Sequence, residues 1–316
     1  MKICMAGEGA FAHKHLDALR NIADIEVVTL AGGVEHDTKA CATKYNIPHW
    51  SLNLEECLSQ NGVEAVIAAT PTPIHASQAQ QILRAGKHVM IEIPMSESLA
   101  DAEAVCAAQR ETGLVAMVGH TRRFNPSHQW INSRIRNGEL TIQQLDVQTF
   151  FFRRKNLNAL GQPRSWTDHL LWHHAAHTVD LFAYQTGEDI IDVQAIQGPI
   201  HPDLGIAMDM SIGLKTRSGA ICTLALSFNN DGPLGTFFRY ICDNGTYIAR
   251  YDDLVDGNEN PVDLSSVDVS MNGIELQDRE FFAAIREGRE PNGSVHQILP
   301  TMQVLDALER ALEEKG

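Results

Sequence analysis

The sequence predicts an α/β protein in which a doubly wound parallel sheet is followed by an α+β domain built on a mostly antiparallel sheet. Apolar, strand-like runs alternate with helical patterns up to Gly119. The first of these runs ends in a glycine-rich turn that opens a helix. Beyond residue 140, strand-like runs joined by hairpin turns predominate. For 316 residues we expect two domains, 1–120 and 121–316.

The first turn carries the pattern GxGxxA. Residues 2–6 predict a buried strand and residues 11–20 a helix. Gly7 permits the tight turn, Gly9 lets a phosphate approach the backbone, and the small Ala12 allows close packing of helix on strand. Because a helix N-terminus favours an anion, we predict a dinucleotide site here rather than an ordinary βα turn. Its candidate residues are Gly7, Gly9, Ala10, Phe11 and Ala12.

The rest of the first domain repeats this alternation. Strand-like runs cover residues 25–30, 65–69, 88–91 and 115–118, and helical patterns cover 37–45, 74–85 and 98–112. The strands are apolar throughout, which is typical of a parallel sheet covered on both faces. The sequence therefore predicts a Rossmann domain that ends near Gly119.

The pattern then changes to that of the second domain. Asn125 and Pro126 predict a capped helix start, with the helix running towards residue 137. Strand-like runs follow at 145–152, 190–197, 208–214, 220–228, 236–241 and 246–251, and one long helix is expected over 168–186. Residues 252–271 read as a loop or irregular edge. Helices over 277–287 and 294–315 close the chain, and we expect the last to pack on the first domain.

Charge and composition exclude several classes of partner. A net charge of −15 argues against a nucleic-acid partner. The six cysteines are scattered without a CxxC pair, no leader-like segment precedes the first strand, and no apolar run reaches the length of a membrane span. We expect a cytoplasmic protein with reduced thiols, no membrane partner and no metal framework.

One stretch departs from the acidic balance. Residues 122–164 contain eight lysine and arginine residues and two acidic ones. A basic stretch in an acidic chain indicates a local anion site. Solvated helix and strand faces that are basic by chance are the alternative.

The end of the second strand bears on the choice of cofactor. An acid at this place would hold the ribose hydroxyls of NAD, yet residues 30–33 are Leu-Ala-Gly-Gly. Glu35 is the first acid and lies past the glycine pair Gly32 and Gly33, whereas His36 and Lys39 could approach a 2′-phosphate. We therefore expect NADP, with NAD as the alternative.

Two further strand ends lie at the same carboxyl edge of the predicted sheet. One carries Thr70, Pro71, Thr72 and His75, and the other carries Glu92, Ile93 and Pro94. Ligands of open α/β sheets bind at this edge, so we expect these side chains near the cofactor.

Together these motifs have a specific resemblance. GxGxxA, TPxxxH, AGKHVxxExP and the run Arg-Arg-Phe-Asn-Pro at 122–126 resemble the glucose-fructose oxidoreductase, inositol dehydrogenase and rhizopine catabolism oxidoreductase family over nearly the whole chain. The resemblance implies hydride transfer from a CH–OH group to a nicotinamide and a homodimer or homotetramer. Ile93 stands where members usually carry a lysine near the reacting hydroxyl, so a proton relay through that position is absent.

Residues 166–180 hold the candidate acid–base group. His173 and His177 are four residues apart and Asp180 is three further on, so an α-helix places them on one face. The resemblance implies that His177 is the acid or base and that His173 replaces an aspartate of the family's pattern. Histidine suits this role because it titrates near neutrality. A structural histidine face is the alternative, and zinc would need a third ligand that no familiar spacing supplies.

The same substitutions bear on the substrate. Loss of a lysine and an aspartate, with Arg122 and Arg123 kept and His173 and His174 added, favours carboxylates over sugar hydroxyls. The detailed runs resemble a branch of the family in the protocatechuate 4,5-cleavage route of lignin-derived aromatic catabolism. That resemblance implies oxidation of a carboxylated cyclic hemiacetal to a pyrone dicarboxylate.

In this interpretation Arg122, Arg123 and Arg164 hold carboxylates, Trp166 and Trp172 wall the planar ring, and His174 joins the pocket. Two alternatives stay open: a sugar or inositol dehydrogenase of the same family, and a regulator that binds NADP without catalysis.

Overall fold

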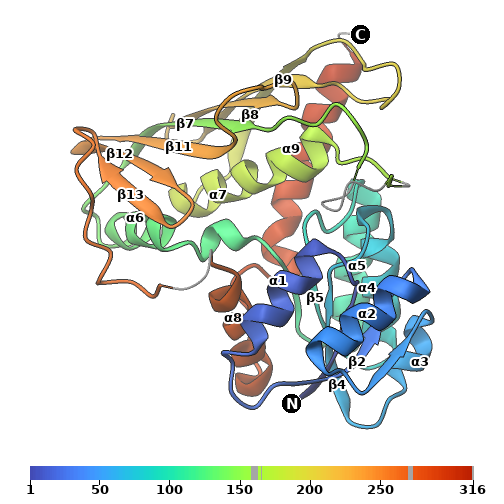
Figure 1. Cartoon of the computed structure of the whole chain (residues 1–316). Helices are drawn as coiled ribbons and strands as arrows, with labels where there is room; N and C mark the ends of the chain where they lie inside the picture. The colour runs from blue at the N-terminus through green and yellow to red at the C-terminus, as the bar shows by residue number, and fades with distance from the viewer. Residues whose placement is uncertain (158–162, 165, 270–272, 315–316) are drawn as a thin grey trace. The chain divides into compact units, whose positions relative to one another are not determined.

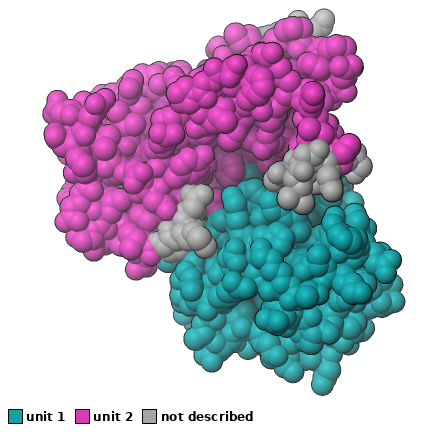
Figure 2. Space-filling view, in the orientation of Figure 1, with its two compact units in different colours: residues 1–120, 274–299 teal, residues 121–273, 300–316 magenta. Residues whose placement is uncertain are grey.

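The structure, a computed structural model, describes residues 1–157, 163–164, 166–269 and 273–314. The chain divides into two units (Figure 2). Unit 1 comprises Met1–His120 and Ile274–Leu299, and unit 2 comprises Thr121–Gly273 and Pro300–Gly316. The predicted domains, 1–120 and 121–316, differ from these units in residues 274–299, which group with the N-terminal part of the chain.

Unit 1 is built on a six-stranded parallel sheet with the order β3-β2-β1-β4-β5-β6. Its strands are β1 (Lys2–Ala6), β2 (Glu26–Ala31), β3 (His49–Ser51), β4 (Val63–Ala68), β5 (His88–Ile91) and β6 (Ala116–Val118). Because the strand order reverses beside β1, the turn after β1 lies at the switch point where such sheets bind ligands. The predicted Rossmann sheet is confirmed.

The helices of unit 1 connect these strands (Figure 1). They are α1 (Ala10–Leu19), α2 (Glu35–Tyr45), α3 (Leu54–Leu58), η1 (Thr72–Ile74), α4 (His75–Arg84), α5 (Leu99–Thr112), α8 (Ile274–Glu287) and the first part of α9 (Val295–Glu313). Asn53 caps α3 and Ser98 caps α5, each by accepting a backbone N–H. Helix α1 packs against α8, and α4 packs against α5. Residue 315, expected at the end of the last helix, lies outside the described residues.

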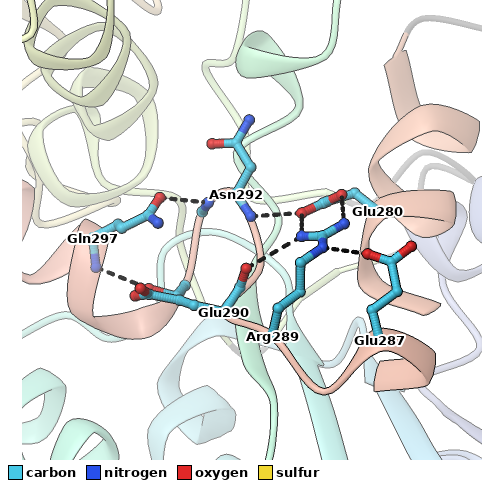
Figure 3. Close-up of polar contacts among 8 residues, drawn as sticks. Glu280, Glu287, Arg289, Glu290, Asn292 and Gln297 are labelled. Atoms are coloured by element: carbon cyan, nitrogen blue, oxygen red, sulfur yellow. Dashed lines mark hydrogen bonds and ion pairs between the residues drawn. The ribbon is translucent and has the colours of Figure 1, made fainter. Parts of the chain in front are cut away.

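The connection from α8 to α9 is closed by charged and polar side chains (Figure 3). Arg289 donates to both carboxylate oxygens of Glu280, at 2.6 and 2.8 Å, and to Glu287 at 2.5 Å. Glu280 also accepts the backbone N–H of Asn292 at 2.7 Å, and Gln297 accepts that of Gly293 at 2.9 Å. The turn is therefore fixed within unit 1.

Unit 2 is built on a seven-stranded sheet with the order β13-β12-β11-β7-β10-β9-β8, in which only the β7–β10 pair is parallel among the described strands. Its strands are β7 (Ile142–Phe150), β8 (Ile190–Gln197), β9 (Asp209–Thr216), β10 (Ile221–Ser227), β11 (Gly235–Cys242), β12 (Gly245–Arg250) and β13 (Asp253–Asp256). The mostly antiparallel sheet is confirmed. β13 is its edge strand within the predicted irregular segment 252–271, of which residues 270 and 271 lie outside the described part.

The helices of unit 2 are η2 (Thr121–Arg123), α6 (Pro126–Arg136), η3 (Leu170–Ala175), α7 (Ala176–Thr186) and the rest of α9. Of these, α6 and α7 lie against one face of the sheet (Figure 1). Pro126 is the first residue of α6 as predicted, but Asn125 does not cap it. The Asn125 side chain instead accepts from Arg122 at 3.3 Å and donates to Asp252 at 2.7 Å.

The long helix expected over residues 168–186 has a different geometry. It begins at Leu170 as a π-helix and continues as an α-helix only from Ala176. His169 is extended, and its Nδ1 accepts the backbone N–H of Leu171 at 3.2 Å, which starts the helix two residues later than predicted. Wide turns of this kind are frequent at functional sites.

The structure bears on two expectations drawn from composition, the state of the cysteines and the membrane spans. All six cysteines are buried, and none forms a disulfide. Of the helices in the described ranges, none combines the length and apolar character needed to cross a membrane.

Candidate active site

The glycine turn after β1 has a shape that only small residues allow. Gly7 has a φ of +110°, and a Cβ there would lie 2.3 Å from the carbonyl oxygen of Ala69. The Gly7 N–H donates to the Ala31 carbonyl at 2.8 Å, which ties the turn to the end of β2. Any larger side chain at Gly7 would push the turn away from Ala69, at the end of the neighbouring strand β4.

The residues after this turn fit the pyrophosphate of a dinucleotide. Gly9 precedes α1 without a side-chain cap, and the first turn of α1 carries no acid. A Cβ on Gly9 would meet nothing within 4 Å, so the space over the helix N-terminus is open. Ala12 is fully buried, whereas Phe11 is 47% exposed. Open backbone N–H groups at a helix N-terminus are the usual binding site for phosphate.

At the end of β2 the structure shows an acid that sequence reasoning missed. Glu8, between the two glycines of the motif, accepts the backbone N–H groups of Gly33 and Val34 through Oε1 at 2.8 and 2.9 Å. Gly32 packs so closely on Thr38 that a Cβ would overlap it. The acidic residue inside the GxG pattern was the available signal, but its partners lie 25 and 26 residues away.

The two residues expected to approach a 2′-phosphate are on the outside of α2. His36 Nδ1 lies 3.1 Å from the Asp37 carboxylate, and both His36 and Lys39 are exposed. The first turn of α2 also carries Glu35 and Asp37.

At the carboxyl edge of β4 and β5, His75 joins the two strand ends. Its Nε2 lies 2.7 Å from the Thr70 carbonyl oxygen and its Nδ1 lies 2.8 Å from that of Pro94. Thr72 is buried at the start of η1, and the Thr70 hydroxyl donates to Gln78 at 2.7 Å. His75 therefore fixes the loop, and the hydroxyl of Thr70 is held by α4.

Glu92 and Ile93, both predicted near the cofactor, are also buried. Glu92 accepts from His15 at 3.0 Å, and the other ring nitrogen of His15 lies 2.9 Å from Asp278. Burial alone would lower the pKa of His15, but the carboxylates of Asp278 and Glu92 raise it to about 10. Burial would likewise raise the pKa of Glu92, which His15 lowers. The imidazolium thus keeps Glu92 ionised and fixed in position.

In unit 2, the end of η3 and the start of α7 carry three histidines, His173, His174 and His177. His174 is 7% exposed, and its ring lies against Phe151, Phe228 and His173. Burial, followed by the charges of His173, Arg153, His177 and Arg164, lowers the pKa of His174 well below its ordinary value. His174 is therefore neutral at pH 7. His173 and His177 are half-buried.

Beside these histidines, two arginines share one carboxylate. Arg164 donates to Asp168 at 3.2 Å, and Arg153 contacts the other oxygen of the same carboxylate. Burial and the charge of Arg164 lower the pKa of Arg153 to about 10. One carboxylate cannot neutralise two guanidiniums, so the cluster retains a positive charge that would attract an anion. Sequence reasoning counted Arg153 among the basic residues but did not single it out, and missed Asp168.

The same carboxylate bears on metal binding. Asp168, His173 and His174 have ligand atoms within 4.8 Å of one another. Because Asp168 already binds two guanidiniums, a divalent cation there would face two positive charges. The residues present thus favour an anion over a metal ion.

Arg122 and Arg123 have different environments. Arg123 is 6% exposed and forms a two-point ion pair with Asp180, at 2.9 and 2.6 Å. Arg122 is 9% exposed, with its guanidinium over the rings of Phe238 and Tyr251.

The two tryptophans also differ. Trp172 is 2% exposed and donates its indole N–H to Glu309 at 2.8 Å. Trp166 is half-buried and lies under the guanidinium of Arg164, 4.6 Å from the ring centre. Of the two, only Trp166 lies beside the arginine pair, where it orients Arg164.

Known proteins match both parts of the chain. Residues 1–120 match the family described as "Oxidoreductase family, NAD-binding Rossmann fold", and residues 126–268 match "Bacterial oxidoreductases, C-terminal". A 4-carboxy-2-hydroxymuconate-6-semialdehyde dehydrogenase from Sphingobium sp. is 66% identical over 316 residues, which are 100% of both chains. This finding confirms the family and the branch that the sequence motifs indicated.

Solved structures share the fold over the full length. The aldose-aldose oxidoreductase from Caulobacter crescentus, complexed with glycerol, has a TM-score of 0.85 at 21% identity and covers 100% of this chain and 99% of its own. An oxidoreductase from Agrobacterium radiobacter, in complex with NAD+, L-tartaric acid and magnesium, has a TM-score of 0.84 at 16% identity, covering 100% and 97%. With the family matches and the full-length identity, these findings establish that the chain belongs to the NAD-binding Rossmann oxidoreductase family of glucose-fructose oxidoreductase and inositol dehydrogenase.

Proposed function

We propose that this NAD(P)-dependent dehydrogenase oxidises 4-carboxy-2-hydroxymuconate-6-semialdehyde, as its cyclic hemiacetal, to 2-pyrone-4,6-dicarboxylate in protocatechuate 4,5-cleavage. The observation that carries this proposal is the 66% identity, over the whole of both chains, to the Sphingobium dehydrogenase for that substrate. The retained positive charge at Arg153, Arg164 and Asp168 supports a substrate that carries carboxylates.

Arg164 and Arg153 are the proposed carboxylate ligands. Arg164 is partly exposed, with 15% of its side chain accessible, and Trp166 supports its planar guanidinium. Arg122 and Arg123 were expected from the sequence to do the same. The structure supports them less, because Arg122 lies over two aromatic rings and donates to Asn125, and Asp180 neutralises Arg123. Trp172 also has less support as a ring wall because its indole holds Glu309.

The proposed proton acceptor is His177, with His173 as the other candidate. A half-buried imidazole can accept the hydroxyl proton of the hemiacetal and pass it to solvent. His174 stays neutral and is suited to hydrogen bonding rather than to charge. When bound, the oxidised nicotinamide accepts hydride from the ring carbon that carries the hydroxyl. With Ile93 in place of a lysine, proton removal depends on these histidines.

NADP is the proposed cofactor, with NAD as a second acceptor. Lys39, exposed on α2, supports binding of a 2′-phosphate, while the carboxylate bound at the end of β2 comes from Glu8 and supports NAD as the second acceptor. For assembly we propose a homodimer or homotetramer through the outer face of the β7–β13 sheet. Ile196 and Ile221 are 65% and 39% exposed on that face. Sedimentation of the purified protein tests this assembly.

The proton-acceptor assignment is tested with His177→Asn and His173→Asn. Turnover of the semialdehyde and binding of the oxidised cofactor are measured on each variant. We expect the variant that lacks the base to lose at least about a hundredfold in kcat, with the cofactor Kd changed by less than about twofold. Wild-type turnover in both variants would remove the histidines from the mechanism.

A further inference from the structure

We propose that Glu8 sets the discrimination between NAD and NADP, and that its carboxylate is what allows this chain to use NAD beside NADP. The inference rests on the proposed nicotinamide-dependent function and adds to it the residue that distinguishes the two cofactors.

The observation is a carboxylate bound to the backbone at the start of α2. Glu8 Oε1 accepts the N–H of Gly33 at 2.8 Å and the N–H of Val34 at 2.9 Å. Val34 is the residue that precedes α2, and its backbone is extended. A Cβ on Gly33 would lie 3.6 Å from the same oxygen, an ordinary van der Waals distance, so the carboxylate packs directly against this glycine.

The Glu8 carboxylate lies where a dinucleotide-binding sheet holds the adenosine ribose. In dinucleotide-binding sheets the end of the second strand faces the adenosine ribose, and an acid there accepts from the ribose hydroxyls. Here β2 ends in Ala31, and Gly32 and Gly33 follow. Glu8 comes from the turn after β1 and brings a carboxylate to the same place. Oε2 has no hydrogen-bond donor among the described residues, so it is available to a ribose hydroxyl.

A 2′-phosphate bound at this place would compete with Glu8 for the same two N–H groups. Backbone N–H groups at a helix start are strong ligands for phosphate, but here they already bind an anion. The phosphate of NADP must therefore displace Glu8 or bind beside it against charge repulsion. Glu35 and Asp37 in the first turn add negative charge, and Asp37 also holds His36. Lys39, in the next turn of α2, is an exposed cation that could offset the repulsion.

Charge and contact can be separated by two substitutions. Glu8→Gln removes the charge and keeps an oxygen that accepts the two N–H groups, so it preserves the loop. Glu35→Gln removes the same charge from an exposed residue of the same helix turn without touching those N–H groups. Glu35→Gln is therefore the matched control for a general electrostatic effect.

The experiment measures binding by titration calorimetry on the full chain, with NADP⁺, NAD⁺, 2′,5′-ADP and 5′-AMP as probes. We expect Glu8→Gln to bind NADP⁺ and 2′,5′-ADP about tenfold or more tightly relative to NAD⁺ and 5′-AMP. This gain in affinity should become smaller as the salt concentration rises. Glu8→Ala should weaken the binding of NAD⁺, because the ribose hydroxyls lose their hydrogen-bond acceptor. Glu35→Gln should change the NADP⁺ to NAD⁺ ratio by less than about threefold.

Three outcomes overturn the inference. If Glu8→Gln leaves the ratio of the two Kd values unchanged, or Glu35→Gln shifts it equally, Glu8 does not set the discrimination. A wild-type protein that binds neither dinucleotide removes the proposed function together with the inference. If the wild type binds both cofactors and Glu8→Gln shifts the ratio, but the semialdehyde is not oxidised, the inference stands and only the proposed substrate falls.

Discussion

Asp180 holds Arg123 in a two-point ion pair: Nε donates to Oδ2 at 2.9 Å and Nη2 donates to Oδ1 at 2.6 Å. Both side chains are buried, at 5% and 1% exposure. Burial alone would lower the pKa of Arg123, but Asp180 raises it, so both groups stay charged. The ion pair thus joins η2, which carries Arg123, to α7, which carries Asp180.

Removal of one member of this pair should be strongly destabilising. Asp180→Asn leaves the Arg123 guanidinium buried without its counter-charge, which costs about 3–5 kcal/mol of unfolding free energy. The double substitution Arg123→Met with Asp180→Leu should recover much of that loss. Urea denaturation measures both. Arg134→Ala breaks the exposed pair with Glu139 and should cost less than about 1 kcal/mol, so an equal cost for Asp180→Asn would contradict this account.

Two glycines of the first turn should respond differently to alanine. Gly7→Ala forces a Cβ to within 2.3 Å of the Ala69 carbonyl at a φ of +110° and should destabilise unit 1. Gly9→Ala meets open space, so the thermal midpoint should stay within a few degrees of wild type. It should nevertheless weaken cofactor binding by about tenfold or more, because its methyl group occupies the approach of the pyrophosphate. Unchanged cofactor binding in Gly9→Ala would place the cofactor elsewhere.

The buried His15 network predicts a loss of stability at alkaline pH. The folded pKa of His15 is about 10, above its ordinary value of 6.5, because of the carboxylates around it. A pKa raised by folding gives stability that is fully present below the unfolded pKa and is lost as the pH rises through about 10. The free energy of unfolding should therefore fall between pH 7 and 10 more steeply in wild type than in His15→Gln. Parallel curves for the two proteins would contradict a charged His15.

Substitution of Arg164 should weaken the binding of the substrate and leave the binding of the cofactor unchanged. Arg164→Met should raise KM for the dicarboxylate substrate by about tenfold or more, because it removes a charge-assisted hydrogen bond. Arg154→Met is the matched control, since Arg154 is exposed in the same basic stretch and stacks on Phe152. Steady-state kinetics and cofactor titration measure both. An equal rise in KM for the two variants would show that only the general positive charge of the stretch matters.

Much of the fold follows from local patterns in the sequence. Five strands of the parallel sheet were predictable because each contains an apolar run bounded by turn residues, whereas β3 (His-Trp-Ser) has no such run and was not predicted. The GxGxxA turn was predictable because Gly7 meets a local steric need. The second sheet was predictable because its strands alternate and because short hairpin turns join β9 to β10 and β11 to β12. The start of α6 at Pro126 follows from the fixed φ of proline.

The site was less predictable because its contacts join distant residues. His15 and Asp278 are 263 positions apart, and Arg123 and Asp180 are 57 apart. Local spacing grouped Asp180 with His177 on a helix face, but the spacing could not show that Arg123 takes up the carboxylate. The pairing of Glu8 with the start of α2 and the sharing of Asp168 by two arginines likewise depend on loops that no periodic pattern describes.

The most direct test of the proposed function is reduction of nicotinamide by freshly made 4-carboxy-2-hydroxymuconate-6-semialdehyde, followed by absorbance beside a panel of neutral polyols and aldoses. We expect rapid reduction with the semialdehyde alone, with both NADP⁺ and NAD⁺ as acceptors, and a dicarboxylate lactone as product. Comparable reduction by neutral polyols would contradict the anion-binding role of Arg153 and Arg164. Cofactor binding without reduction by any of these compounds would mean that the chain is not this dehydrogenase.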